Sequence, residues 1–180
     1  MKALVPIADG SEEMEAVIII DTLRRAGWSV TVAGIGGEVI EASRGVRLVP
    51  DLPWEAVDPD DYDVLLLPGG WNGTLTLRDH EGVKAALRAF AESGRWYGAI
   101  CAAPLVLHAA GLLEGRRFTC YPGVEKELPS HFERSEDKVV VDGRMITSQG
   151  PGTAFEFALR AIAECDDPAR AEEVRRGLLL

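Results

Sequence analysis

The sequence lacks a basic surplus, and this absence limits the partners it can have. Its 180 residues include 19 Lys or Arg and 29 Asp or Glu, for a formal net charge of −10. A phosphate backbone binds to a basic face or stripe, and no such cluster is present. We therefore expect no nucleic-acid partner.

Long apolar runs are also missing. The longest ones, such as AVIII, have the length of a strand or of part of a core helix, well short of a membrane-spanning segment. The first ten residues, MKALVPIADG, do not form a signal-peptide pattern. We expect no membrane partner and a cytoplasmic location.

Cysteine is scarce, and the known cofactor motifs are incomplete. Cys101, Cys120 and Cys165 are 19 and 45 residues apart, which fits neither a metal knuckle nor a C-x-x-C pair. GIGGEV lacks the last glycine of a dinucleotide fingerprint, and PGGWNG lacks the Lys-Ser/Thr end of a phosphate loop. We therefore expect free thiols, no metal site and no cofactor.

Short apolar segments alternate with helical patterns along the whole chain. This order predicts an α/β fold of flavodoxin-like type, a three-layer sandwich with a mostly parallel sheet, in one domain over 1–180. Asp9 or Ser11 is the expected N-cap of the first helix. The expected strands are 2–8, 28–35, 62–70, 95–100 and 116–120, with an Asp-Gly hairpin in 138–148 and a smaller hairpin in 38–51. The expected helices are 11–27, 82–93 and 104–110, and a long one that opens at 150–165.

Loops at the carboxyl ends of parallel strands are the places where ligands bind. Cys101 stands at such an end, followed by Ala102, Ala103 and Pro104 and then by a helix. This strand-turn-helix pattern predicts a cysteine nucleophile elbow, with the thiol near a helix N-terminus that favours the thiolate. The alternative is an inert core cysteine.

The other two cysteines are weaker candidates. Cys120 also ends a segment expected to be a strand, so it is either a packing residue or a second thiol at the same mouth. Cys165, beside two aspartates at a helix end, is expected to be structural.

No histidine suits the role of a base for Cys101. His108 lies two turns along the following helix, and His80 and His131 lie in polar segments. Glu15 follows the first strand and stands against AVIII, where burial would keep its carboxyl neutral and able to donate a hydrogen bond to a thiolate. We predict a neutral Glu15 beside an ionised Cys101, with Glu12 and Glu13 in solvent.

The loop PGGWNG supports two alternatives. Gly69 and Gly70 follow a core strand, so their backbone N–H groups can face an anion, or the segment can be a plain turn.

Several stretches together resemble the ThiJ/PfpI family, in the branch of the parkinsonism-associated protein and its bacterial ThiJ-like relatives. The resemblance covers nearly the whole chain. The matching stretches, in order, are GSEEMEAV, RRAGWSVTVAG, SRGV, YDVLLLPGG, AICAAP, GLLEGRR, YPGVEKEL and VVVDGRMITSQGPGTAFEFAL.

The resemblance implies roles for individual residues. Cys101 matches the reactive nucleophile, Glu15 its protonated partner, and Gly69 and Gly70 the amides that face a substrate oxygen, with Ala102 beside them. The family is usually homodimeric, with its site near the two-fold interface. Residues matching positions near that interface, and expected as pocket neighbours, are Arg25, Arg44 and Pro151.

Two positions depart from the family pattern. Tyr121 stands where the parkinsonism branch has a histidine, and a phenol is a proton donor and not a base near neutrality. Ala102 stands where the protease-like branch has a histidine, which disfavours peptidase activity.

Relatives are described as acting on glyoxal and methylglyoxal or on their early adducts on proteins. The resemblance therefore implies a cofactor-independent glyoxalase or deglycase, with a small aldehyde or a glycated protein as substrate. The alternative is a redox sensor or stress chaperone that uses oxidation of Cys101. A role in thiamine biosynthesis ranks last, because no phosphate loop is present.

Overall fold

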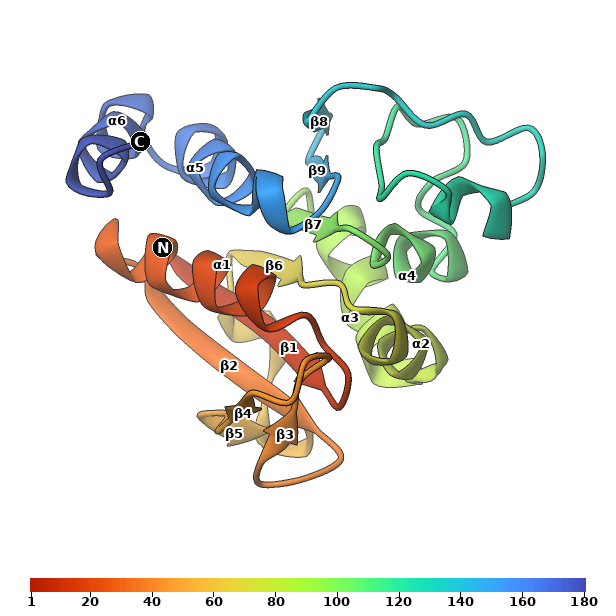
Figure 1. The fold of residues 1–180 in the computed structure, drawn as a ribbon, viewed down its shortest axis with the longest axis horizontal. Coiled ribbons are helices and arrows are strands. Elements are labelled where there is room, and N and C mark those ends of the chain that lie inside the picture. Colours follow the sequence, from red (N-terminus) through yellow and green to blue (C-terminus); the bar gives the residue numbers. More distant parts are fainter.

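The computed structural model describes residues 1–180 as a seven-stranded sheet between two layers of helices (Figure 1). All neighbouring strands run parallel except the last pair, β8 and β9, which confirms the predicted mostly parallel α/β sandwich. The order across the sheet is β5 (Leu52–Pro53), β2 (Ser29–Ile35), β1 (Lys2–Ala8), β6 (Val64–Leu67), β7 (Trp96–Ile100), β9 (Met145–Ser148) and β8 (Val139–Asp142). The predicted small hairpin is β3 (Ile40–Glu41) with β4 (Arg47–Leu48).

Each face of the sheet has its own apolar core and its own helices. One core contains side chains of α1 (Glu13–Arg25), α5 (Ala154–Cys165) and α6 (Pro168–Gly177). The other contains side chains of α2 (Trp71–Asp79), α3 (Glu81–Glu92) and α4 (Pro104–Ala109). Single 3-10 turns lie at Trp54–Ala56, Pro59–Asp61, Val124–Glu127 and Pro151–Thr153.

The central strands are apolar at every position because helices cover both of their faces. All residues of β6 and β7 are buried, as are all but the first residue of β1. A strand buried on both faces has no polar alternation, so its sequence is a continuous apolar run. This is why these strands were predictable from sequence.

The N-cap of α1 is Glu12, so the expectation of Asp9 or Ser11 was wrong. The Glu12 carboxylate accepts a hydrogen bond from the N–H of Glu15, at 2.7 Å. Ser11 instead accepts from the N–H of Ala8, and Asp9 accepts from that of Glu41. Both earlier side chains are thus used to shape the turn between β1 and α1.

Two helices, α2 and α6, were not predicted from the sequence. The glycines of PGGWNG favour a loop, yet Gly73 lies within α2. Residue 73 is a glycine because a methyl group there would come within 2.5 Å of the Ser11 backbone nitrogen. α6 begins with Pro168 after Asp167, whose carboxylate accepts from the N–H of Ala169 at 2.8 Å. That Asp-Pro pair is an ordinary helix start signal.

The strand expected at 116–120 is absent. β9 already pairs with β7 on one side and β8 on the other, so no place beside it remains for another strand. The segment uses side chains instead: the N–H groups of Arg117 and Thr119 donate to Asp142 and Thr147.

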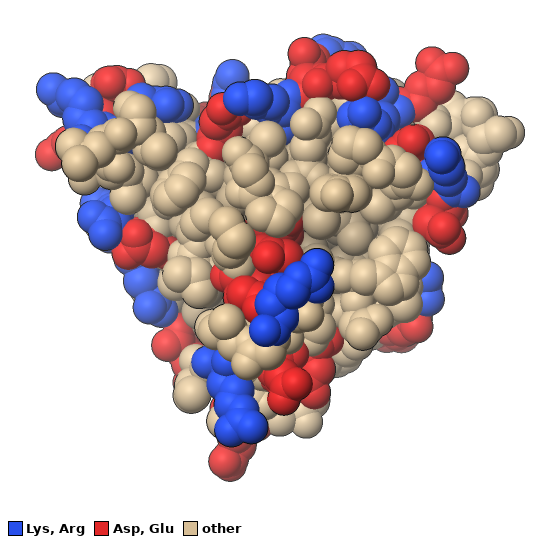
Figure 2. Space-filling model, in the orientation of Figure 1, with Lys and Arg blue, Asp and Glu red and all other residues tan.

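The surface carries charges of both signs. On the face shown in Figure 2, Lys and Arg alternate with Asp and Glu around the edges, and no continuous basic stripe crosses it. None of the helices combines the length and the apolar character that crossing a bilayer requires.

The strand order brings three loops together. β1, β6 and β7 are neighbours, so their carboxyl ends at Ala8, Leu67 and Ile100 lie side by side at one edge of the sheet. In the sheet, β2 lies on one side of β1, and β6 and β7 lie on the other side. Ligands of open α/β sheets bind at such a reversal of strand order.

Candidate active site

Cys101 occupies a sharp corner between β7 and α4. Its φ angle is +65°, in the left-handed region that non-glycine residues seldom adopt. The corner is fixed by two hydrogen bonds, from the N–H of Cys101 to Ser148 O and from the N–H of Ala103 to Ile100 O, both 3.0 Å long. A backbone held in this region at the end of a buried strand is typical of a functional site.

Glu15 lies in the first turn of α1 and is fully buried. Its Oε2 accepts a hydrogen bond from the backbone N–H of Gly69, at 2.7 Å. Its Oε1 is also buried and has no hydrogen-bond partner. An unpartnered carboxylate oxygen in the interior is costly, so a proton on Oε1 is favoured.

The glycine at position 69 lets the thiol and the carboxyl approach each other. A methyl group on Gly69 would lie 2.6 Å from Cβ of Cys101 and 2.8 Å from Oε2 of Glu15. No residue with a side chain fits between them. The loop after β6 therefore packs directly against both the thiol and the carboxyl group.

The electrostatics of the pair exclude two simultaneous negative charges. Burial raises the pKa of Glu15 to about 7, although the hydrogen bond from Gly69 lowers it. Burial, and after it the charge of an ionised Glu15, raises the pKa of the Cys101 thiol to about 12, whereas the N–H groups of Gly70 and Ala102 lower it. The pair therefore carries at most one negative charge near neutral pH.

A cavity of about 470 Å³ opens over Cys101. Of the residues predicted for the site, Gly70, Ala102, Arg44, Tyr121 and Pro151 line it together with Cys101. It is large enough for a small organic ligand and leads to the thiol.

Comparison with known proteins identifies the family of this site. The model of the DJ-1/PfpI family matches residues 1–164. The chain belongs to this family. The resemblance deduced from sequence motifs is thereby confirmed.

Two relatives align with this chain over nearly the whole length of both proteins. The protein dj-1beta of Drosophila melanogaster is 44% identical over 180 residues, which cover 99% of this chain and 96% of that protein. The glutathione-independent glyoxalase DJR-1.2 of Caenorhabditis elegans is 36% identical over 178 residues, covering 98% and 94%.

Solved structures of DJ-1 proteins share the fold. The crystal structure of Drosophila melanogaster DJ-1beta has a TM-score of 0.94, with 99% of this chain and 97% of that chain covered at 44% identity. Toxoplasma gondii DJ-1, in an oxidized form, has a TM-score of 0.94 at 40% identity, with the same coverage of 99% and 97%.

Two site predictions for this DJ-1/PfpI chain need revision. Arg25 does not line the cavity: it lies at the far end of α1 from Glu15 and pairs with Asp21, at 2.6 Å. The N–H of Gly69 is donated to Glu15, which leaves the N–H groups of Gly70 and Ala102 as the donors nearest the sulfur. The Arg25 assignment came from the family pattern, and the Gly69 assignment from that pattern and from the place of Gly69 after a core strand. Neither source carries information on which way an amide or a side chain points.

The first-turn glutamates are not in solvent as expected. Glu12 is partly buried as the N-cap, and Glu13 is buried and accepts from the hydroxyl of Ser43 and the N–H of Arg44, at 2.8 and 2.9 Å. Burial raises the pKa of Glu13, but hydrogen bonds, from its own N–H and then from Ser43 and Arg44, together hold it below the ordinary value. Glu13 thus anchors the loop that carries Arg44 into the cavity wall.

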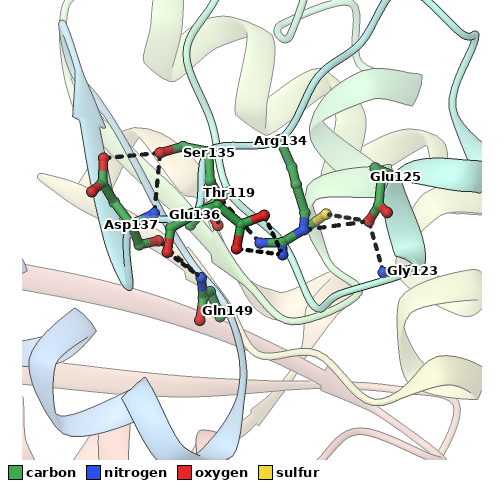
Figure 3. A network of polar contacts seen from close by, with 9 residues as sticks. Thr119, Gly123, Glu125, Arg134, Ser135, Glu136, Asp137 and Gln149 are labelled. Atoms are coloured by element: carbon green, nitrogen blue, oxygen red, sulfur yellow. Dashed lines mark hydrogen bonds and ion pairs between the residues drawn. The ribbon is translucent and has the colours of Figure 1, made fainter.

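Cys120 is a buried packing residue and does not line the cavity. It lies beside the polar network of Glu125 and Arg134 that Figure 3 shows. Its sulfur lies 4.0 Å from Oε2 of Glu125, and burial raises the pKa of the thiol to about 12. Cys165 is partly buried at the end of α5, as expected for a structural residue.

The histidines are all away from Cys101. His80 caps α3, His131 faces Glu114 at 3.2 Å, and the ring of His108 packs edge-on against Phe132. No group of three or more His, Cys, Asp or Glu side chains is arranged to hold a metal ion.

Some lining residues of the cavity were not singled out from the sequence. Trp71 and Asn72 begin α2, and Val124 begins the 3-10 turn after Tyr121. The available signal was their position close after a glycine, Gly70 for Trp71 and Asn72 and Gly123 for Val124.

Replacing Glu15 by Gln should change how stability depends on pH. The pKa of Glu15 is raised from 4.5 to about 7. The contribution of Glu15 to the free energy of unfolding is therefore complete below pH 4.5 and is lost as the pH rises through 7. Relative to wild type, the stability of Glu15→Gln should therefore rise by up to about 3 kcal/mol between pH 4.5 and 8. Urea unfolding at several pH values measures this difference.

The matched control is Glu55→Gln, which makes the same change at an exposed position. A stability difference for Glu15→Gln that stays constant from pH 4.5 to 8 would contradict the raised pKa.

Proposed function

We propose that the chain is a cofactor-independent glyoxalase or protein deglycase acting on glyoxal, methylglyoxal or their early adducts on proteins. The observation that carries this proposal is the unpartnered Oε1 of buried Glu15 beside the Cys101 thiol. A thiol and an uncommitted acid at one cavity are the groups that this chemistry requires. The relative from Caenorhabditis elegans, named a glutathione-independent glyoxalase, supports the same activity.

The reaction begins with addition of the Cys101 sulfur to the aldehyde carbon. A C–S bond forms, and the aldehyde oxygen takes the proton of the neutral Glu15 to give a hemithioacetal, which leaves Glu15 as a carboxylate. The N–H groups of Gly70 and Ala102, which approach the sulfur, stabilise negative charge on that oxygen as it develops.

Glu15 then moves a proton between the two adjacent carbons. Oε1 takes the proton from the former aldehyde carbon and returns one to the former ketone carbon, because Oε2 is occupied by the Gly69 N–H. The product is a thioester of a hydroxy acid. Water cleaves its C–S bond, which releases the hydroxy acid and restores the thiol, so no outside oxidant or reductant is needed.

We place the charge of the pair on Cys101 below pH 7, where Glu15 keeps its proton. Two N–H groups, from Gly70 and Ala102, approach the sulfur, whereas an ionised Glu15 would accept one N–H, from Gly69, and the S–H of Cys101. An S–H group is a weaker donor than an N–H group, so the negative charge is better stabilised on the sulfur.

The charge placement predicts the pH dependence of Cys101 alkylation. Glu15→Leu removes a hydrogen-bond donor to the thiolate and should raise the midpoint pH by about 1 to 2 units. Glu15→Gln keeps an N–H donor and should raise it less. Alkylation at Cys101 is followed by mass spectrometry, which separates it from the other two thiols.

A charged Glu15 beside a neutral thiol would shift the midpoint pH of alkylation in the opposite direction. If Glu15 carried the charge in wild type, removing it would lower the midpoint in both variants. A midpoint that falls, or that is the same in all three proteins, rules out the neutral acid.

Methylglyoxal turnover tests the proposed activity. We expect purified protein to form lactate, Cys101→Ser to abolish it, and Glu15→Gln to reduce kcat by roughly 10²- to 10⁴-fold through loss of proton transfer. Lactate should be measured directly, because loss of methylglyoxal alone also reports adduct formation.

A redox sensor is the second candidate. The related Toxoplasma gondii structure is described as oxidized. An oxidised sulfur on Cys101 would accept the same N–H groups of Gly70 and Ala102. Absence of lactate together with selective oxidation of Cys101 by mild peroxide would favour the sensor over the enzyme.

We also propose that the chain forms a homodimer through α1. Met14 and Val17 on this helix are 55% and 47% exposed, beside the cavity-forming loops, while Ala16 and Ile19 of the same helix are buried. The apolar character of AVIII on every side is explained if a second copy covers the outer face.

Val17→Glu should dissociate such a dimer, because it places a charge in the contact. Sedimentation velocity measures the mass, and Ala85→Glu on the exposed side of α3 is the matched control. A wild-type monomer at micromolar concentration, or a dimer unaffected by Val17→Glu, contradicts the proposed interface.

A further inference from the structure

The cavity over Cys101 has aromatic walls. Trp71 and Tyr121 line it and are 47% and 50% exposed. They are the only aromatic residues among the exposed large apolar side chains of the chain. Aromatic area left in water is unfavourable, so its concentration at one cavity points to a ligand that covers it.

The backbones of both aromatic residues lie next to groups that contact Cys101. Trp71 directly follows Gly70, whose N–H group lowers the pKa of the Cys101 thiol by a hydrogen bond to its sulfur. The N–H of Tyr121 donates to Cys101 O at 2.9 Å. Both side chains line the same cavity as the sulfur, so a ligand joined to Cys101 enters the space that they border.

The ring of Tyr121 packs against the backbone of a neighbouring loop. It packs on Gly150, where a methyl group would lie 3.1 Å from the ring. The adjoining turn is held by Glu125, which accepts from the N–H of Gly123 at 2.7 Å and lies 3.7 Å from Arg134 (Figure 3). The Arg134 side chain is only 12% exposed and also pairs with Glu136 at 3.0 Å. The tyrosine wall is thus preorganised, which limits the entropy lost on binding.

The cavity is also larger than the simplest substrates need. Its volume of about 470 Å³ falls in the range of sites for ligands far larger than glyoxal or methylglyoxal. Glyoxal has no substituent, and methylglyoxal has one methyl group, so neither covers the two rings.

We infer that the preferred substrates are α-oxoaldehydes with a flat apolar substituent, an aryl group, seated against Trp71 and Tyr121. This inference rests on the proposed function and extends it to a substrate class. The chemistry is unchanged: the aldehyde carbon is oxidised to a carboxylate, the ketone carbon is reduced to an alcohol, and one water is consumed. With phenylglyoxal, the product is mandelate.

The test compares phenylglyoxal with methylglyoxal, with mandelate and lactate measured directly. Wild type should have the higher kcat/KM for phenylglyoxal, and the ratio of the two values should fall about tenfold in Trp71→Ala and in Tyr121→Ala through KM. Tyr121→Phe keeps the ring and should keep the ratio. Leu179→Ala removes a 93% exposed apolar side chain elsewhere and serves as the control.

A ratio that is unchanged in both alanine variants, or a wild type that prefers methylglyoxal, overturns the inference and leaves the proposed function intact. If neither aldehyde is turned over, the proposed function fails, and the aromatic site is tested by binding. Mandelate should then protect Cys101 from iodoacetamide more than lactate does in wild type, and this advantage should disappear in Trp71→Ala. Equal protection by the two acids also overturns the inference.

Discussion

The hydrogen bond from the Gly69 N–H to Oε2 of Glu15 is the contact on which the site depends. It connects the loop after β6 with the first turn of α1, at the corner that holds Cys101. It also decides which carboxyl oxygen is free, because the occupied Oε2 leaves Oε1 as the atom that can exchange a proton. Position 69 must be glycine for this contact to form, since a side chain would collide with both partners.

The sheet supplies the frame for that contact. Because β1, β6 and β7 are parallel neighbours, the turns after them meet at one edge and bring Glu15, Gly69 and Cys101 together from distant parts of the sequence. Burial at this edge then allows only one negative charge on the pair. The pKa values are therefore consequences of the packing as much as of the residue types.

The acidic composition acquires a structural explanation. Many carboxylates hold the backbone of turns and helix starts, and so replace hydrogen bonds that the regular elements cannot provide. Glu13 positions the loop of Arg44 in this way, and Glu125 holds the turn behind Tyr121. Carboxylates that accept a backbone N–H are Asp9, Glu12, Glu13, Glu15, Asp51, Asp58, Asp63, Glu125, Asp142 and Asp167.

The sequence by itself determined the α/β class and the central strands, and it singled out Cys101 and Glu15 as candidate site residues. Doubly buried strands are continuous apolar runs, and a cysteine between such a strand and a helix is visible as a pattern. Tertiary structure alone decided that 116–120 is not a strand, that α2 forms despite its glycines, and that Arg25 lies away from the cavity. These outcomes depend on which sheet edges are occupied, which backbones touch and where an amide points, and none of these is a property of neighbouring residues in the chain.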